Sequence, residues 1–320
     1  MTIKHIVISG GGPTGLLSYG AAKYLEQQNF WNISNIESIY GTSIGALFGV
    51  IISLQHDWET IDKYIIKCPW DTILKKNSTF NDVLDVYTNK GIMSGEFFDI
   101  IMKPLLLAKD LTLDVTLYQL YQFNKKDIHI MTVELNTFQL VNLNHKTHPS
   151  LKVMDAIKMS CAFPILFSPK IFIEKELNKK EEGQVQEYSS RVCCYIDGGV
   201  MCNYPINVCI EDQRCNPDEI LGFRNIWEKY HETIDNESSL VDFLKICVKQ
   251  MIRKLENEKS YISIKNEVSC VGEIIECTSW FDLCSDESKR IQYIHRGMTY
   301  GEVFLRMINK KENNISDKNK

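Results

Sequence analysis

The 320-residue sequence predicts an α/β fold, in which helices cover both faces of a central, mostly parallel sheet in three α/β/α layers. Two observations predict it. The apolar run His5-Ile6-Val7-Ile8 leads into a glycine string, and residues 16–27 then carry apolar side chains at helical spacing. The same order repeats at once, with a strand over 36–40 and a helix over 44–54. Strand–turn–helix alternation is typical of parallel strands joined by helices.

The remaining elements follow with longer breaks. Helical segments are expected between 57 and 123, where Thr116 and Gln119 form a capping box and Pro104 should kink or end its helix. The polar stretch 174–191 is expected to be an exposed loop between two strands. Further strands are predicted at 128–133, 138–143, 171–173, 192–196 and 268–277, and further helices at 153–160, 240–255 and 286–309.

We expect one domain, because the sequence has no internal repeat and no proline-rich linker. A catalytic core is expected over 3–208, and helices and strands of 209–309 should complete the same domain. The tail 310–320 is too polar to pack and is expected to be disordered.

Composition and charge narrow the functional class. The net charge of −5 argues against a nucleic-acid binder and against tight electrostatic docking on anionic lipid. The start of the chain shows no secretory leader, so we expect a cytoplasmic protein whose 11 cysteines are mostly small, buried and reduced. No Cys-x-x-Cys pair suggests zinc, and no metal or cofactor is expected. The longest uncharged stretch, 38–55, contains three glycines and is shorter than the ~20 apolar residues of a membrane-spanning helix.

A serine stands on a turn between a predicted strand and a predicted helix. The string Gly41-Thr42-Ser43-Ile44-Gly45 matches Gly-x-Ser-x-Gly. That pattern holds a nucleophilic serine in strained dihedrals and needs small neighbours, so that nearby backbone can approach. The alternative is a glycine-rich turn whose serine only caps the following helix.

The glycine string Gly10-Gly11-Gly12-Pro13-Thr14-Gly15 has two possible uses. It can expose consecutive N–H groups to an oxyanion, or it can bind the phosphates of a dinucleotide. The dinucleotide reading requires an acidic residue at the end of the second strand, and Glu37 comes too early in that strand. The phosphate-loop pattern is also absent, because Gly15 is followed by Leu16 and Leu17.

A carboxylate ends a later strand, at Asp197-Gly198-Gly199. It could accept a proton from a serine, although Asp-Gly-Gly is also a common turn. A Ser-His hydrolase would need a histidine after this aspartate, and the sequence offers His231 in a charged stretch and His295 within a predicted helix. Neither is placed as a general base would be.

These strings together resemble the patatin-like phospholipase family, over about two-thirds of the chain. A fourth string supports the resemblance: Ser160-Cys161-Ala162-Phe163-Pro164, with Phe167, resembles the Ser-x-Ala-x-Pro-x-x-Phe segment of that family. The resemblance implies a Ser–Asp dyad without histidine, in which Ser43 is the nucleophile and Asp197 the proton acceptor. It implies an oxyanion hole formed by Gly10, Gly11 and Gly12, supported by Gly15, Gly41, Gly45, Gly198 and Gly199. Thr14 departs from the family, which usually carries Arg or Lys there.

The implied activity is that of a lipid acyl hydrolase of the phospholipase A type, acting through an acyl-enzyme and a short Ser43–Asp197 hydrogen bond. Its partners would be lipid substrates, reached by transient contact with membrane surfaces. The stretch 97–107 could be a wall of the acyl channel, an interfacial patch or ordinary core, and 165–167 could line the pocket or fill the interior. Two other readings remain: a catalytically silent lipid-binding protein on the same fold, and a nucleotide-binding enzyme.

Overall fold

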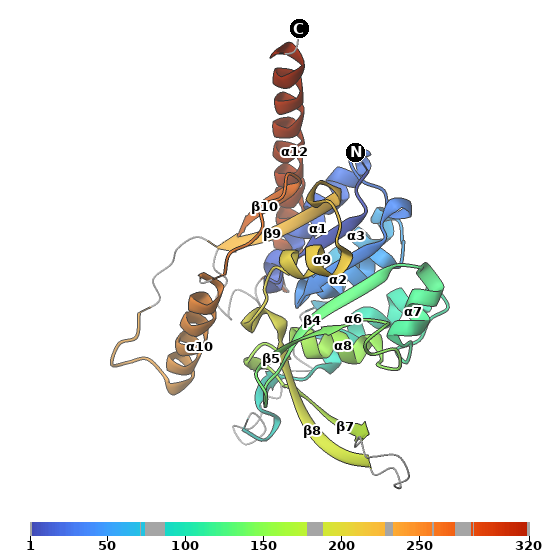
Figure 1. Cartoon of the computed structure of the whole chain (residues 1–320). Helices are drawn as coiled ribbons and strands as arrows, with labels where there is room; N and C mark the ends of the chain where they lie inside the picture. Colours follow the sequence, from blue (N-terminus) through green and yellow to red (C-terminus); the bar gives the residue numbers. More distant parts are fainter. Residues whose placement is uncertain are drawn as a thin grey trace.

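A computed structural model (Figure 1) describes residues 2–70, 72–73, 87–177, 188–227, 233–257, 259–272, 283 and 285–318. Within these residues the main sheet has eight strands in the order β10-β9-β1-β2-β4-β8-β7, and β5 pairs with β4. The strands are β1 (His5–Ile8), β2 (Ser38–Thr42), β4 (Asp127–Glu134), β5 (Gln139–Leu143), β7 (Lys170–Leu177), β8 (Tyr188–Asp197), β9 (Ile220–Trp227) and β10 (Glu267–Gly272). A separate pair joins β3 (Gly91–Met93) to β6 (Ile165–Phe167).

The sheet is mostly parallel, as the sequence predicts. Strands β10, β9, β1, β2 and β4 run parallel to one another, whereas the pairs β4–β5, β4–β8 and β8–β7 are antiparallel. The carboxyl ends of parallel strands share one edge of the sheet, where ligands bind in open α/β folds. The antiparallel β8 ends beside β4, with Asp197 opposite Thr132.

Helices cover the two faces unequally. The alternation of β1 places Ile6 and Ile8 in a large cluster beneath several helices, and Val7 in a smaller cluster on the other face with Tyr204 and Ile206. The helices are α1 (Gly15–Gln27), α2 (Ile44–Ser53), α3 (Trp58–Lys67), α6 (Glu96–Leu107), α7 (Leu117–Asn124), α8 (Val153–Cys161), α9 (Ile206–Gln213), α10 (Leu240–Asn257) and α12 (Glu287–Lys318). Helices α1, α2, α8 and α12 belong to the larger layer and α9 to the smaller one, so the fold is a three-layer α/β/α sandwich.

The expected loop over 174–191 was too long. Strand β7 extends to Leu177 and β8 begins at Tyr188, and the two pair in register along this length. A hairpin that projects from the sheet needs backbone pairing but no apolar run, so its polar sequence concealed its strands (Figure 1). Residues 178–187 lie outside the described residues.

We expected Pro104 to kink or end its helix; helix α6 continues through Pro104 to Leu107, so it does not end there. A proline removes the N–H that would bond the carbonyl four residues earlier, here that of Ile100. The Tyr64 hydroxyl lies beside this gap: it donates to the Ile101 carbonyl at 2.8 Å and makes a longer contact with the Ile100 carbonyl at 3.4 Å.

The C-terminal tail also differs from the expectation. Helix α12 runs to Lys318, through most of the tail that we expected to be disordered (Figure 1). A helix that packing has already nucleated gains one hydrogen bond for each residue it adds, so a polar sequence can extend it into solvent. The predicted strand 268–277 is described only as β10, and 273–277 lie outside the described residues.

Two other expectations, on the start of α7 and on the cysteines, are confirmed. The capping box of Thr116 and Gln119 opens α7. The nine described cysteines are free thiols, and six of them are buried. None of the helices in the described ranges is both long and apolar enough to cross a bilayer.

Candidate active site

Ser43 occupies a sharp turn between β2 and α2. Its φ of 53° and ψ of −126° are strained for a residue with a side chain. The flanking glycines are needed for close packing: a Cβ on Gly41 would lie 2.6 Å from the Ala46 backbone, and one on Gly45 would lie 2.4 Å from the Ile8 carbonyl oxygen. The turn therefore presents the serine hydroxyl at the carboxyl edge of the sheet, at the N-terminus of α2.

The hydroxyl of Ser43 donates to Asp197 across 2.6 Å, so the predicted short contact is present. The other carboxylate oxygen of Asp197 accepts from the Gly199 N–H at 2.7 Å. Asp197 is only 2% exposed, and burial raises its pKa to about 6 although both hydrogen bonds lower it. No histidine stands between the two side chains. His295 lies in α12, and His231 lies outside the described residues.

One turn at the end of α8 holds both members of this pair. The hydroxyl of Ser160 accepts from the Ser43 N–H at 2.8 Å and donates to the Met131 carbonyl at 2.6 Å. Two residues later, the Ala162 carbonyl accepts from the Asp197 N–H at 3.0 Å. The fourth sequence string thus joins β2, β4 and β8 at the site, a role that the sequence reasoning left unassigned.

The glycine string passes directly beside the serine. A Cβ on Gly10 would lie 3.3 Å from the Cβ of Ser43. The Gly10 N–H, however, already donates to the Asn203 carbonyl at 2.9 Å, so we do not carry Gly10 forward as a proposed oxyanion donor. Within the described residues, the N–H groups of Gly11 and Gly12 have no hydrogen-bond acceptor, and they precede the N-terminus of α1.

Two side chains orient these free N–H groups. The Gly11 N–H shares a peptide plane with the Gly10 carbonyl, which accepts from the Asn225 side-chain amide at 3.2 Å. The Gly12 N–H shares a plane with the Gly11 carbonyl, which accepts from the Thr14 hydroxyl at 2.7 Å. Thr14 is fully buried and supplies a neutral hydrogen bond at the position where the family resemblance leads us to expect Arg or Lys. The sequence reasoning missed Asn225, whose signal is a polar residue in the apolar strand β9.

The remaining predicted glycines allow close approach around the pair. A Cβ on Gly15 would lie 2.7 Å from the Ile44 side chain, and one on Gly198 would lie 2.3 Å from the Met131 carbonyl oxygen. A Cβ on Gly199 would lie 2.9 Å from the Asp197 carboxylate. Each position therefore excludes a larger side chain for a steric reason.

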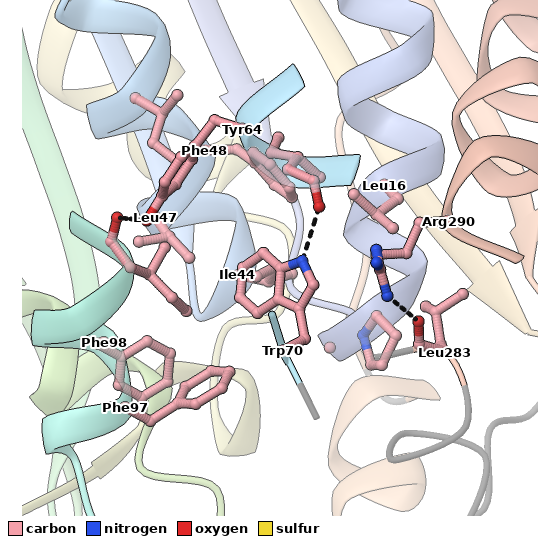
Figure 2. Close-up of a pocket in the computed structure, with 15 residues that line it drawn as sticks. Leu16, Ile44, Leu47, Phe48, Tyr64, Trp70, Phe97, Phe98, Leu283 and Arg290 are labelled. Atoms are coloured by element: carbon pink, nitrogen blue, oxygen red, sulfur yellow. Dashed lines mark hydrogen bonds between the residues drawn. The ribbon is translucent and has the colours of Figure 1, made fainter. Parts of the chain in front are cut away.

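An apolar pocket adjoins this site (Figure 2). The empty space within it, counted together with its open mouth, is about 670 Å³. Phe97, Phe98 and Ile101 line it and also belong to the main buried cluster, so this part of 97–107 is both pocket wall and core. The other lining residues are Gly12, Pro13, Leu16, Ile44, Leu47, Phe48, Ile51, Tyr64, Ile65, Trp70, Leu283 and Arg290. Ile44 and Gly12 place this pocket next to Ser43 and the glycine string.

Two pocket residues come from the C-terminal third of the chain. The guanidinium of Arg290 donates to the carbonyls of Ile66 at 2.6 Å and Leu283 at 3.3 Å (Figure 2 shows the second of these). Phe167 lies outside the pocket lining, and its ring packs behind those of Phe97 and Phe98 in the core. The C-terminal region therefore completes the pocket wall.

Comparisons with known proteins find a family model and several similar proteins. The model of the patatin-like phospholipase family matches residues 6–210. The uncharacterized protein R571 of Acanthamoeba polyphaga mimivirus is 24% identical over 82% of this chain and 78% of its own length. The probable lipid hydrolase 463L of Invertebrate iridescent virus 6 is 22% identical over 72% of this chain and 73% of its own.

Solved structures resemble this chain more distantly. VipD from Legionella pneumophila aligns with a TM-score of 0.47 and 15% identity, over 92% of this chain and 67% of VipD. The type III effector ExoU of Pseudomonas aeruginosa aligns with a TM-score of 0.43 and 11% identity, over 96% of this chain and 53% of ExoU. Since the family model covers well over half of the sequence, this chain belongs to the patatin-like phospholipase family.

Proposed function

We propose that this protein is a lipid acyl hydrolase of the phospholipase A type, which cleaves fatty-acyl esters through Ser43 and Asp197. The observation that carries the proposal is the 2.6 Å hydrogen bond between the serine hydroxyl and the buried carboxylate. A carboxylate becomes a useful base for an alcohol when it is desolvated and in direct contact. Asp197 meets both conditions.

In the first step, Asp197 takes the proton of Ser43 while the serine oxygen attacks the ester carbonyl carbon. The carbonyl oxygen becomes an oxyanion, and the N–H groups of Gly11 and Gly12 are the donors that we assign to it. Collapse of this tetrahedral intermediate breaks the bond to the alcohol, which leaves with the proton held by Asp197. The fatty acyl group remains esterified to Ser43.

In the second step, water attacks the acyl-enzyme. Asp197 takes a proton from the water, and the same glycine N–H groups stabilise the second oxyanion. When the intermediate collapses, the Ser43 oxygen leaves, recovers the proton, and free fatty acid is released. This sequence assigns both proton transfers to a single carboxylate.

The pocket supports an acyl chain as the group held during these steps. Its walls are aliphatic and aromatic, and Ile44 follows the proposed nucleophile directly. Burying an acyl chain in this pocket would favour binding by about 0.8 kcal/mol for each CH₂ group removed from water. We further propose that the protein works in the cytoplasm and reaches lipid by peripheral contact with membranes.

The test is product analysis of phospholipid incubated with wild type, Ser43→Ala and Asp197→Asn. The proposal expects free fatty acid and lysophospholipid from wild type only. Labelling of Ser43 by a fluorophosphonate probe should accompany this activity. A folded wild-type protein that releases no fatty acid and resists the probe would instead be the silent lipid-binding protein. Thermal stabilisation by NAD or ATP without labelling would favour the nucleotide-binding enzyme.

A further inference from the structure

The side chain of Asn203 lies beside the proposed dyad, and neither step of the proposed reaction uses it. It is only 9% exposed, and within the described residues its amide has no hydrogen-bond partner. A buried polar group without a partner costs free energy, so it is rarely left in this state without a function. An amide of this kind next to reacting atoms points to a ligand that supplies the missing hydrogen bond.

Two glycines locate the oxygen of this amide. A Cβ on Gly10 would lie 2.4 Å from the Asn203 Oδ1 atom and 3.3 Å from the Ser43 Cβ. A Cβ on Gly199 would lie 3.1 Å from the same Oδ1 atom and 2.9 Å from the Asp197 carboxylate. The amide oxygen therefore lies between the glycine string and the aspartate turn, close to both members of the dyad.

The backbone around Asn203 is fixed to the segments that carry the site. Its carbonyl accepts from the N–H of Gly10, which follows β1, at 2.9 Å. The Cys202 carbonyl accepts at 2.8 Å from the hydroxyl of Thr42, the last residue of β2. The Cys202 N–H donates to the Gly198 carbonyl at 2.7 Å. Hydrogen bonds to three segments thus hold the backbone that carries the amide, and a catalytic group needs this kind of support.

We infer that the Oδ1 atom of Asn203 orients the water that attacks the acyl-enzyme, an inference that rests on the proposed hydrolase function. Asp197 takes one hydrogen of this water as a proton. The other hydrogen needs an acceptor that turns an oxygen lone pair toward the acyl carbon, and the Asn203 Oδ1 atom is that acceptor. This second hydrogen stays on the oxygen and leaves in the carboxyl group of the fatty acid.

The same oxygen atom distinguishes water from an alcohol as the group that receives the acyl chain. An alcohol has a single hydroxyl hydrogen, which Asp197 takes, and a carbon in place of the second hydrogen. That carbon cannot donate to the Asn203 Oδ1 atom, so the buried amide stays unpaired while an alcohol attacks. Asn203 therefore favours hydrolysis over transfer of the acyl group to an alcohol.

The test is the partition of the acyl-enzyme between water and methanol, with a p-nitrophenyl ester as the acyl donor. Asn203→Leu keeps the approximate shape of the side chain and removes the acceptor, and Asn203→Ala does so with a smaller side chain. Asn207→Leu is the matched control, because the Asn207 amide donates to the Ser260 carbonyl at 2.9 Å and accepts from the Ile262 N–H at 3.0 Å. The ratio of methyl ester to free fatty acid is measured for each protein.

Both Asn203 variants should raise this ratio about tenfold, which corresponds to one lost hydrogen bond in the attack by water. Asn207→Leu should leave it at the wild-type value. The acyl-enzyme should accumulate in the Asn203 variants, which the intact-protein mass detects. Their rate of labelling by a fluorophosphonate should stay within about twofold of wild type, because labelling needs no water. The ratio is taken within the active molecules, so partial unfolding of a variant does not change it.

An unchanged ratio in both Asn203 variants would overturn the inference, as would an equal rise in Asn207→Leu. Labelling that slows as much as hydrolysis would also overturn it, because the amide would then only support the turn. A wild type that neither reacts with the probe nor releases fatty acid would refute the hydrolase itself. A wild type that does both, with a ratio independent of Asn203, would refute only the role in orienting water.

Discussion

Two buried carboxylates, on the neighbouring strands β4 and β8, lie toward opposite ends of these strands and have different surroundings: one is among cationic side chains and the other is not. Asp127 begins β4, and its oxygens lie 2.7 Å from the Lys146 ammonium, 3.1 Å from the His129 ring and 3.0 Å from the His145 ring. Asp197 ends β8 and contacts a hydroxyl and a backbone N–H, and none of the described Lys, Arg or His side chains pairs with it.

The pKa values of the two groups diverge for this reason. Burial alone would raise the pKa of Asp127, but contacts with His129 and Lys146 bring it well below its ordinary value. Burial raises the pKa of Asp197 to about 6, because neutral hydrogen bonds offset only part of the desolvation. Asp127 is thus paired with cationic side chains and stabilises the fold, whereas Asp197 has only neutral partners and keeps a carboxylate basic enough to accept a proton.

The largest expected effect is that of Asp197→Asn. Loss of the base should lower kcat by roughly 10³-fold or more. The same change should raise the free energy of unfolding at pH 8 by about 2 kcal/mol, because it removes a buried charge. Lipid hydrolysis and urea unfolding measure the two effects. If Asp197→Asn lost activity and also unfolded more easily than wild type, the ionised Asp197 would not be a destabilising buried charge.

Asp127→Asn should show the reverse pattern. Without the carboxylate, Lys146 and the two histidine rings lose their partner, and the free energy of unfolding should fall by about 2 kcal/mol at neutral pH. Hydrolysis by the folded variant should stay within about twofold of wild type. Because the native pKa of Asp127 is depressed, its stabilising contribution is lost as pH falls through the acid range. Urea unfolding as a function of pH should therefore show a smaller acid-induced decrease in the variant.

The pH profile sharpens the comparison further. Asp197 must be ionised to accept a proton, so kcat/KM should fall about tenfold per unit below pH 6. Its raised native pKa also means that its charge lowers stability as pH rises from about 4 to above 6. Asp127→Asn is the control, and its acid limb should coincide with that of wild type. If Asp127→Asn shifted the acid limb of the profile, the limb would report the ionisation of Asp127 and not that of Asp197.

Thr14→Val tests whether neutral hydrogen bonds organise the active end. It removes the hydroxyl donor to the Gly11 carbonyl and leaves only the longer bond from the Thr14 N–H, at 3.2 Å, so the direction of the Gly12 N–H is held less firmly. We expect kcat to fall roughly tenfold with little change in KM, since an oxyanion donor acts mainly in the transition state. Thr14→Ser keeps the hydroxyl and should retain most of the activity. Equal loss in both variants would point to packing instead.

The smallest effect concerns the backbone of Ser43. Both Ser43→Gly and Ser43→Ala remove the nucleophile, but only glycine adopts φ 53° and ψ −126° without strain. The glycine variant should be more stable than the alanine variant by about 1 kcal/mol. Thermal unfolding of the two proteins measures the difference. Equal stabilities would mean that the turn carries no strain.

Much of the site was readable from the sequence, because each motif is a local requirement of the chain. A strand that ends in a glycine-flanked serine must turn sharply, and an aspartate followed by two glycines must end its strand. The order of the strings and the helical and strand periods together predicted the fold. Local patterns could not predict the hairpin lengths, since strand pairing at Leu177 and Tyr188 depends on a partner rather than on composition.

The sequence by itself determined the residue types, the turns that present them and the parallel core of the sheet. Only the tertiary structure decided which N–H groups are free: Gly10 is committed to Asn203, whereas Gly11 and Gly12 are not. The tertiary structure also placed Thr14 and Asn225 where they donate to the carbonyls of Gly11 and Gly10, and so fix the directions of the free N–H groups. It turned the apolar face of α10 toward solvent. The physical reason is the same in each case. A hydrogen bond or a buried face needs a partner from a distant segment, and the spacing within one segment does not specify that partner.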